Sequence, residues 1–567
     1  MRTALLAAIM SVSCGHAPGH GSHDDDPARV DAVADAYVRA TIEHSPLTIE
    51  LLGWPEATYD RFPDHSAAAT AAWNRTVDEL LARLDTLGAQ PPPGSPAWIT
   101  LGFLREALER DRSTRICRSE LWAVDSMGWQ TWIGDVAALQ PVASATQRRV
   151  ALARWARFAG FVDTEIANLR EGLRLGYSAP RSVVERVIEQ LDAMLALTVE
   201  ESPFYEPARR APELAAPFTE LIVTQVRPAL RRYRDFLADT YRHAAREELG
   251  VSANPDGVAC WRASFRAETS LERDPAETVR LGEARVAALA REAAKIAEEA
   301  YGISDLETLQ THITADPEAG FADGAAQLAF ARDTLARAHA AMDRVVAVVP
   351  TARVVVDPYP EFVGAGPSAR YYEADASDGG PATYKVNLLQ HPTRGEAEVV
   401  AFHEAWPGHH LQISIARALP HGHRIRELVG VGSYVEGWAR YAEQVAEELG
   451  LYRTPYGRIR RRLWPGRGMV VDPGIHLYGW TRSRAVAYIT AGGFSAEFAE
   501  GLVDRIAVWP AQLTSYDTGA LEILSLRTEA EQRLGDRFDL RAFNACVLSE
   551  GAVTLPMLRQ IVEACLP

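Results

Sequence analysis

The sequence predicts a mainly α-helical fold with a small antiparallel β element. First, apolar residues recur at three- and four-residue spacing along most of the chain, which is typical of amphipathic helices. Second, short β-type runs are confined to residues 351–388. Third, the composition is that of an ordinary globular protein, with 47% hydrophobic and 24% charged residues in 567. A chain of this length can build a large core without disulfides or metals as staples.

Helical patterns fill the first two thirds of the chain. They cover residues 31–41, 71–87, 101–112, 146–175, 180–197, 213–245, 275–301 and 325–347. The helix at 275–301 has the clearest start. Asp274 is a good N-cap, Pro275 suits the first turn and Glu277 lies three residues after the cap.

The pattern changes near residue 351. β-type runs at 353–356, 369–373 and 383–388 predict a small antiparallel sheet. Its edge either pairs with an extended peptide or belongs to a purely structural hairpin. Helices then resume at 411–418, 429–449, 454–463, 481–491, 496–508, 510–534 and 541–548. We therefore expect one α-rich catalytic domain over residues 29–567. A subdomain boundary near 350 stays open, because no linker marks it.

The N-terminus reads as a targeting segment over residues 1–14. Arg2 precedes an apolar run at 4–10, which is far shorter than the ~20 residues that span a bilayer. The sequence before Cys14 resembles a bacterial lipoprotein processing site, although ordinary signal cleavage is the alternative. Residues 15–28 are expected to form a flexible tether. The chain is thus predicted to be exported, periplasmic or at the cell surface, with contact to the membrane through a lipid on Cys14.

The cysteine count and the net charge limit the compartment and the partners that this protein can have. Cys117, Cys260, Cys546 and Cys565 remain after Cys14, and an even number permits disulfides in an exported protein. Three pairings are possible and the sequence does not choose between them, although Cys546 with Cys565 is a plausible local pair. The net charge of −16 argues against nucleic acid as a partner, because phosphate binding needs a basic face.

The chemistry is concentrated between residues 403 and 436. His403 and Glu404 are followed by His409 and His410, and Glu436 lies on a later helix. Two imidazoles and a carboxylate bind Zn²⁺ and leave one coordination position open. A Glu beside the first His is placed to take a proton from water. The alternative is a buried helix whose histidines are satisfied by hydrogen bonds.

The spacing requires a break in the helix. In the common H-E-x-x-H motif the second His lies four residues after the first, where this chain has Pro407. On a regular helix, position i+7 lies about 10.5 Å further along the axis and i+6 faces the wrong side. Pro407 and Gly408 can interrupt the helix. We expect two extra residues to bulge out, which makes His409 the second ligand, with His410 as the alternative.

These residues resemble a large bacterial family, domain of unknown function 885, whose members are regarded as zinc peptidases. The likeness rests on residues 384–387, 397–412, 435–439, 472–476, 515–519, 526–527 and 535–539. Residues 436–441 are also similar to the third-ligand helix of gluzincin peptidases. The resemblance implies a helical fold akin to angiotensin-converting enzyme and the oligopeptidases. Asp517 and Asn544 depart from the Lys and His that relatives tend to have, which puts specificity in doubt.

The resembling segments also supply candidate roles around the metal. Tyr516 and His476 are candidates to stabilise an oxyanion, although each fits equally a buried hydrogen-bonded core group. Asn387 and Arg527 are candidates to bind substrate, as is His410 if it is not a ligand. Candidate carboxylates to orient a ligating histidine are Glu398, Glu443 and Asp472.

The resulting expectation is a hydrolase that uses one Zn²⁺ to cleave an amide bond, most simply in a short peptide. His403, His409 and Glu436 would hold the ion, and Glu404 would be the general base. A zinc hydrolase of non-peptide amides and an inactive surface lipoprotein that acts as a binding module are the alternatives. A di-iron bundle enzyme would need paired Glu-x-x-His motifs, and no such pair surrounds this site. Substrate, cleavage polarity and oligomeric state stay open.

Overall fold

Helices make up nearly all of the regular structure in the computed structural model, which describes residues 27–87, 90–359, 368–373, 380–419 and 422–566. The mainly α fold class is confirmed. The predicted signal segment, Cys14 and residues 15–26 of the predicted tether lie outside the described residues. Residues 27 and 28 belong to the first helix, α1 (Pro27–His44), so this end of the predicted tether is helical.

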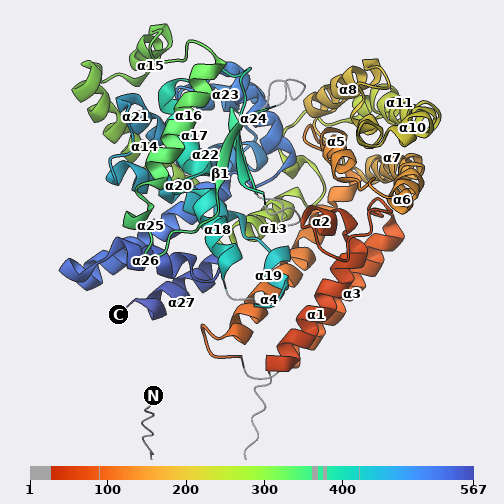
Figure 1. Cartoon of the computed structure of the whole chain (residues 1–567), viewed down its shortest axis with the longest axis horizontal. Coiled ribbons are helices and arrows are strands. Elements are labelled where there is room, and N and C mark those ends of the chain that lie inside the picture. The colour runs from red at the N-terminus through yellow and green to blue at the C-terminus, as the bar shows by residue number, and fades with distance from the viewer. Residues whose placement is uncertain (1–26, 88–89, 360–367, 374–379, 420–421, 567) are drawn as a thin grey trace, which may run out of the picture.

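The N-terminal helices form a bundle (Figure 1). Helices α1, α3 (Ala67–Asp85) and α4 (Pro96–Thr114) contact one another, and short α2 (Pro46–Leu51) follows α1. Ser66 and Ser95 cap α3 and α4, because each side-chain oxygen accepts a hydrogen bond from the backbone three residues later. The bundle shares one hydrophobic core with residues of the C-terminal half.

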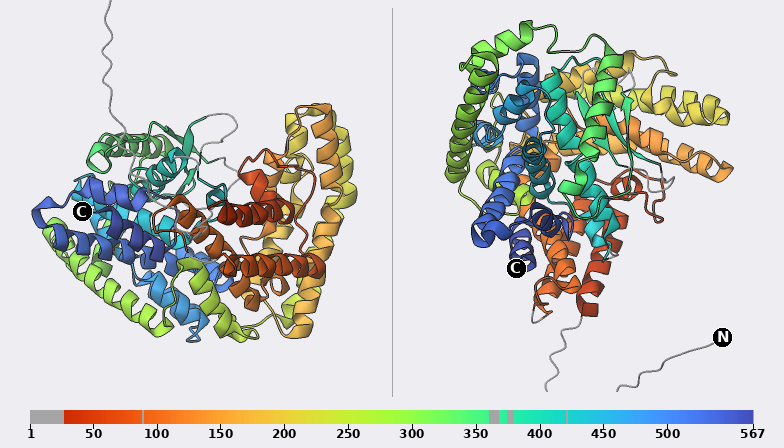
Figure 2. Two further views of the ribbon diagram at one scale, coloured as in Figure 1. Left: turned by 90° about the horizontal axis from the view of Figure 1, so that it is seen from below. Right: turned by 60° about the vertical axis from the view of Figure 1, so that its left-hand side comes forward.

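A second group of helices forms a lobe beside this body, which both views of Figure 2 show as a stack of long helices. Its helices are α5 (Trp129–Leu139), α6 (Ala145–Trp155), α7 (Phe158–Leu175), α8 (Arg181–Ala196), α9 (Glu206–Arg210), α10 (Ala215–Leu221), α11 (Arg227–Phe236) and α12 (Arg242–Ala244). The predicted helix 146–175 is broken before Phe158. The predicted helix 213–245 contains two π-helical turns.

The remaining helices follow the lobe in the chain and include those that carry residues 403–436. They are α13 (Gly257–Thr269), α14 (Pro275–Tyr301), α15 (Leu306–Ala315), α16 (Gly324–His339), α17 (Arg394–Glu404), α18 (His409–Ala418), α19 (Ile425–Leu428), α20 (Gly432–Glu448), α21 (Pro455–Leu463), α22 (Gly468–His476), α23 (Arg482–Thr490), α24 (Ala496–Val508), α25 (Thr514–Leu534), α26 (Leu540–Leu548) and α27 (Leu555–Cys565). Buried residues before and after position 350 belong to one core cluster.

The small sheet has three strands in the order β1-β3-β2. Strand β3 (Ala382–Val386) pairs antiparallel with β2 (Ala369–Tyr372) and parallel with β1 (Val354–Pro358). The prediction of a small sheet next to the metal helix is correct, but the sheet is mixed rather than antiparallel throughout. Strands β1 and β3 run in the same direction, because the chain reverses once before β2 and again after it.

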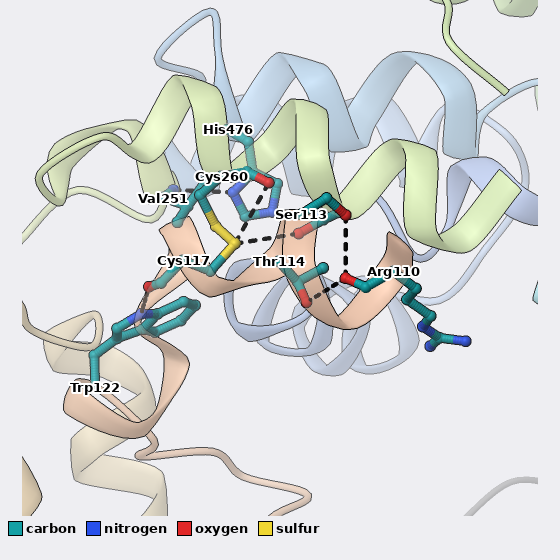
Figure 3. Close-up of a disulfide and its surroundings, with 9 residues drawn as sticks. Arg110, Ser113, Thr114, Cys117, Trp122, Val251, Cys260 and His476 are labelled. Atoms are coloured by element: carbon teal, nitrogen blue, oxygen red, sulfur yellow. Dashed lines mark hydrogen bonds between the residues drawn. A yellow bond between two sulfur atoms is a disulfide. The ribbon is translucent and has the colours of Figure 1, made fainter. Parts of the chain in front are cut away.

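Two disulfides tie the fold together. Cys546 pairs with Cys565, as the local-pair prediction suggested, and Cys117 pairs with Cys260 over a sequence separation of 143. Figure 3 shows the second bridge joining the chain after α4 to α13. All four cysteines that the structure describes are therefore paired. No helix in the described residues is both long and apolar enough for a membrane span.

Candidate metal centre

The helix that carries His403 ends at the next residue. Thr393 and Glu396 form a capping box that starts α17, and α17 stops at Glu404. Residues 405–408 leave the helix, and α18 begins at His409. The predicted two-residue bulge is therefore replaced by a complete helix break, which has the same effect because it brings His409 back toward His403.

Two contacts fix this break. A Cβ atom on Gly408 would lie 1.8 Å from the carbonyl oxygen of His403, so only glycine allows the chain to fold back this closely. The indole nitrogen of Trp438 donates to the carbonyl oxygens of Pro407 at 3.0 Å and Gly408 at 3.3 Å. Trp438 lies two residues after Glu436 on α20. One helix therefore carries both the acidic candidate ligand and the support for the loop.

Helix α20 reaches this position by packing closely on α25. A Cβ on Gly437 would lie 2.5 Å from the Gly519 backbone, and one on Gly519 would lie 1.6 Å from the Ser433 carbonyl oxygen. The two helices can touch at this point because both residues lack a side chain.

His403, His409 and Glu436 form a compact donor cluster. Glu436 Oε2 lies 3.3 Å from His403 Nε2 and 3.6 Å from His409 Nε2. The two imidazole centroids are 4.8 Å apart with their planes at 86°, and one donor atom from each residue lies within 4.8 Å of the others. The structure thus brings together the three predicted ligands.

The two donor separations that involve Glu436 are compatible with a zinc ion. Zinc bonds of about 2.0–2.1 Å at tetrahedral angles place neighbouring ligand atoms about 3.4 Å apart, which matches the two distances to Glu436. The two imidazole side chains are 12% exposed and the carboxylate is 21% exposed, so the cluster is largely but not completely buried. His409 Nδ1 is buried without a hydrogen-bond partner in the described part of the chain.

A second carboxylate orients His403. Glu443 Oε1 lies 2.9 Å from His403 Nδ1 and accepts a hydrogen bond from Arg440 at 2.8 Å. Burial alone would lower the pKa of His403, but the hydrogen bonds with Glu436 and Glu443 raise it to about 9. Burial opposes ionisation of Glu436, but its hydrogen bonds with His403 and His409 hold its pKa well below its usual range. Of the three predicted orienting carboxylates, Glu443 is the one that contacts a candidate ligand.

Glu404 faces the edge of the sheet. Its Oε2 accepts a hydrogen bond of 2.9 Å from the backbone N–H of Tyr371 in β2. Glu404 directly follows His403 in the chain, and this contact ties its carboxylate to strand β2. The predicted general base is therefore positioned by a strand that comes from a separate segment.

His410 lies behind the sheet instead of in the cluster. Its Nδ1 is 3.2 Å from the Tyr371 hydroxyl, its Nε2 is 3.2 Å from the Ala352 carbonyl oxygen, and its ring packs edge-on against Trp406. Burial lowers the pKa of His410 to about 4. The structure thus selects His409 over His410 at the cluster, and it gives His410 a structural role in place of the expected substrate contact.

Tyr516 lies beside the cluster, as predicted. Its ring is stacked near His403, with centroids 6.3 Å apart, and its oxygen accepts a hydrogen bond of 3.3 Å from Arg505. Burial raises the pKa of Tyr516, and the negative charge of Glu436 adds to the rise. The phenol is therefore neutral at ordinary pH and can donate its proton.

His476, the other candidate for the oxyanion, is held elsewhere. Its Nδ1 accepts from Val251 N–H at 3.0 Å and its Nε2 lies 2.7 Å from the Ile506 carbonyl oxygen. Burial lowers its pKa to about 3, and Figure 3 shows its ring beside the Cys117–Cys260 disulfide. Both nitrogens are thus used in the core, so we assign His476 no catalytic role.

The two other predicted substrate contacts also have structural partners. The Asn387 side chain accepts from Leu389 N–H at 3.0 Å in the turn after β3. Arg527 pairs with Glu531 and Glu448. Arg527 lies on α25 about 16 Å beyond Tyr516 at 1.5 Å per residue. It therefore stabilises the helix surface and does not reach the cluster.

The remaining predicted carboxylates and the two departures from the family pattern are buried in other networks. Glu398 accepts from Arg337 and from the start of α21. Asp472 accepts from Trp261 and from Ala511 N–H. Asn544 bridges Tyr441 and Val345. Asp517 is buried near Arg440, whose charge opposes the rise that burial causes in its pKa.

Sequence reasoning missed Arg440, Arg505, Tyr371 and Trp438. Arg440 and Trp438 lie within the segment 435–441 that carries the resemblance, so that motif contained the signal. Arg505 gives no signal, because arginines are common on helices. Tyr371 acts through its backbone N–H, which no side-chain pattern can reveal.

Fold and cluster together define a large, mainly helical protein with a His-His-Glu candidate metal centre. The chain matches the family described as "Bacterial protein of unknown function (DUF885)" over residues 46–562. It therefore belongs to that family, which confirms the resemblance inferred from the motifs.

Two solved structures share the fold. The "putative lipoprotein" from Colwellia psychrerythraea is 23% identical with a TM-score of 0.86, and the match covers 95% of this chain and 99% of that chain. A second "putative lipoprotein of unknown function", from Shewanella oneidensis, is 19% identical with a TM-score of 0.74 and coverages of 94% and 99%. At these identities the likeness extends to the fold alone. No curated protein matches the sequence.

Proposed function

We propose that this protein is a zinc-dependent hydrolase that cleaves amide bonds, most simply in short peptides. The observation that carries the proposal is the clustering of His403, His409 and Glu436, whose donor atoms lie within 4.8 Å of one another. Glu404 directly follows His403 in the chain. Two imidazoles and one carboxylate leave a coordination position open, which is the donor set of catalytic rather than structural zinc sites.

The zinc ion and Glu404 would have different roles in the reaction. When bound, Zn²⁺ supplies Lewis acidity that polarises a substrate carbonyl and makes water more nucleophilic. Glu404 accepts the proton of the attacking water and passes it to the leaving amine. The backbone N–H of Tyr371 donates to one carboxylate oxygen of Glu404, so the other oxygen is left for the proton.

Tyr516 is suited to stabilise the developing oxyanion. Arg505 donates to the phenol oxygen, so the phenol proton is directed away from that arginine and is available to an oxyanion. Burial keeps the phenol protonated. A hydrogen bond to developing negative charge in a site shielded from water is a major source of rate enhancement.

The two disulfides and the two structural relatives support export of the protein. Both disulfides would be reduced in an ordinary cytosol, whereas they persist in oxidising compartments. The two structural relatives are described as candidate lipoproteins. We therefore propose export, with lipid attachment at Cys14 as the link to the membrane.

A peptide-library digest read by mass spectrometry tests the function. The zinc-loaded protein should release new peptide termini, and a chelator should stop this release until zinc is restored. Glu404→Gln protein, purified in parallel, is the control for contaminating peptidases. Equal cleavage by wild type and Glu404→Gln, or no cleavage by the zinc-loaded wild type, would refute the proposal.

A further inference from the structure

Two cations lie side by side on the small sheet. Arg370 in β2 and Lys385 in β3 are direct cross-strand partners in the antiparallel register, so their side chains leave the same face of the sheet. Like charges placed directly opposite each other destabilise a strand pair. This arrangement therefore calls for a compensating negative charge.

The described residues offer no ion pair to either cation. No carboxylate oxygen among them lies within 4.0 Å of Arg370 or Lys385, although most arginines near the site have such a partner. Lysine is also rare here, because Lys295 and Lys385 are the two lysines of a 567-residue chain whose other basic residues are arginines. One of the two thus lies beside Arg370 without a paired acid.

The ring of Tyr372 contacts both cations, and Tyr359 contacts Tyr372. Lys385 Nζ lies 4.8 Å from the centroid of the Tyr372 ring, and the Arg370 guanidinium carbon lies 5.9 Å from the same centroid. The Tyr372 hydroxyl donates to the Tyr359 hydroxyl at 3.3 Å. Cation–π contacts hold both charges over one ring, but they leave the ammonium and guanidinium hydrogens free to donate to an anion.

Arg370 of this cation pair is next in the chain to a contact of the proposed general base. Arg370 immediately precedes Tyr371, whose backbone N–H contacts Glu404. The charges of Arg370 and Glu404 both act on the Tyr359 hydroxyl, which also bonds to Tyr372. The pair of cations is therefore a few residues of extended peptide from the point where the amide bond would be cleaved.

Asp135 of α5 faces the pair from the other lobe. Both Lys385 and Arg370 act on its carboxyl, but burial raises the pKa of Asp135 more than they lower it. Asp135 forms no ion pair with either cation within the described ranges. Asp357 of β1 is the parallel register partner of Lys385 and supplies a second nearby carboxyl. It too forms no ion pair with either cation in the described part of the chain, so the hydrogens of both cations can donate to an added anion.

We propose that Arg370 and Lys385, held over Tyr372, bind a carboxylate of the substrate. This inference rests on the proposed function and narrows its substrate class to peptides that carry a free carboxylate a few residues from the scissile bond. The carboxylate belongs either to the peptide C-terminus or to an acidic side chain. Both present the same oxygen donors to a guanidinium and an ammonium group.

Binding to the inactive enzyme tests the inference without turnover. Zinc-loaded Glu404→Gln protein is titrated with a tetrapeptide library as free acids, as C-terminal amides, and as amides with an internal Asp. We expect the free acids, or the Asp-containing amides if a side chain is the source, to bind about 10- to 100-fold more tightly than neutral amides, as for a hydrogen bond to a charged group. Arg370→Gln with Lys385→Gln should abolish this preference, whereas Lys295→Gln is the matched control and should retain it.

Lysine acetylation gives a second readout. The preferred peptide should slow acetylation of Lys385 and leave that of Lys295 unchanged, as read by mass spectrometry. Equal binding of all three libraries, no binding of any, or a preference that survives the double substitution would overturn the inference. These results are separate from a failure of the proposed function, which would appear as missing zinc or missing hydrolysis in the wild type.

Discussion

Glu436 Oε2 lies 3.3 Å from His403 Nε2, although 33 residues separate them in the chain. Two structural devices bring them together: the helix break after Glu404, and the close crossing of α20 and α25 at paired glycines. The separation is close to the ~3.4 Å between two ligand atoms of one tetrahedral zinc ion, which is why the proposed function places the metal here.

The first prediction concerns the general base. Glu404→Gln should keep zinc at one ion per chain and lower kcat by at least about 10²–10⁴-fold, because it removes proton transfer and leaves the donor cluster intact. Zinc analysis beside peptide turnover checks it. Turnover equal to that of the wild type would remove Glu404 from this role.

The second prediction concerns the carboxylate behind His403. Glu443→Ala should weaken zinc affinity about 10- to 100-fold, because His403 loses the partner that fixes its ring and tautomer. A competition titration with a zinc chelator measures this affinity. Glu448→Gln, five residues further along α20 and paired with Arg527, is the control and should bind zinc like the wild type. Equal affinities in both variants would contradict the assignment.

A third prediction separates oxyanion stabilisation from metal binding. Tyr516→Phe should lower kcat about 10²- to 10³-fold, the range found when one oxyanion donor is removed, with zinc content unchanged. Arg505→Met should lower kcat by less, since the phenol remains. A Tyr516→Phe enzyme with wild-type kcat would show that the ring serves packing alone.

The fourth prediction follows from the close helix crossing. Gly519→Ala should destabilise the fold by about 1–3 kcal/mol or more, because its Cβ would overlap the Ser433 carbonyl and push α20 away. Zinc affinity should fall with it, since Glu436 lies on α20. In Gly501→Ala the added methyl meets no atom within 4 Å, so that variant should be as stable as the wild type or more so. Urea unfolding measures the free energy of unfolding of the two variants. Equal values would argue against the close contact between α20 and α25.

The fifth prediction concerns pH. Burial raises the pKa of Asp472 to about 8, and the hydrogen bonds from Trp261 and Ala511 offset this only in part. The folded protein therefore holds a proton that the unfolded chain releases above about pH 4, so this carboxyl makes the protein less stable as pH rises from about 4 to 8. Asp472→Asn keeps the acceptor oxygen and removes the titration.

Unfolding in urea at pH 5 and pH 8 checks this sign. The stability of Asp472→Asn relative to the wild type should be more favourable at pH 8 than at pH 5. A relative stability that falls with rising pH would mean that Asp472 is charged in the folded protein.

The parts of the fold that the sequence predicted are those where a local signal is strong. The helix at 275–301 was predicted with its cap, because Asp274 and Pro275 mark its start. Helix α22 was missed, because Pro473 and Gly474 disfavour a helix locally and burial of all nine residues overrides this. The parallel pairing of β1 with β3 is a long-range relation that no short pattern encodes.

The same distinction applies to the site. His403, Glu404 and Glu436 were predicted because their residue types and spacing already specify metal chemistry. The choice between His409 and His410 required the backbone path through residues 405–408. A motif does not show whether a side chain faces a ligand or, like His476, is satisfied by two backbone groups.

Anomalous diffraction at the zinc edge, from crystals grown with zinc, tests the central claim most directly. We predict one peak per chain within about 2.0–2.2 Å of a nitrogen of His403, a nitrogen of His409 and an oxygen of Glu436. A peak ligated by His410, or no peak between these three side chains, would contradict the account.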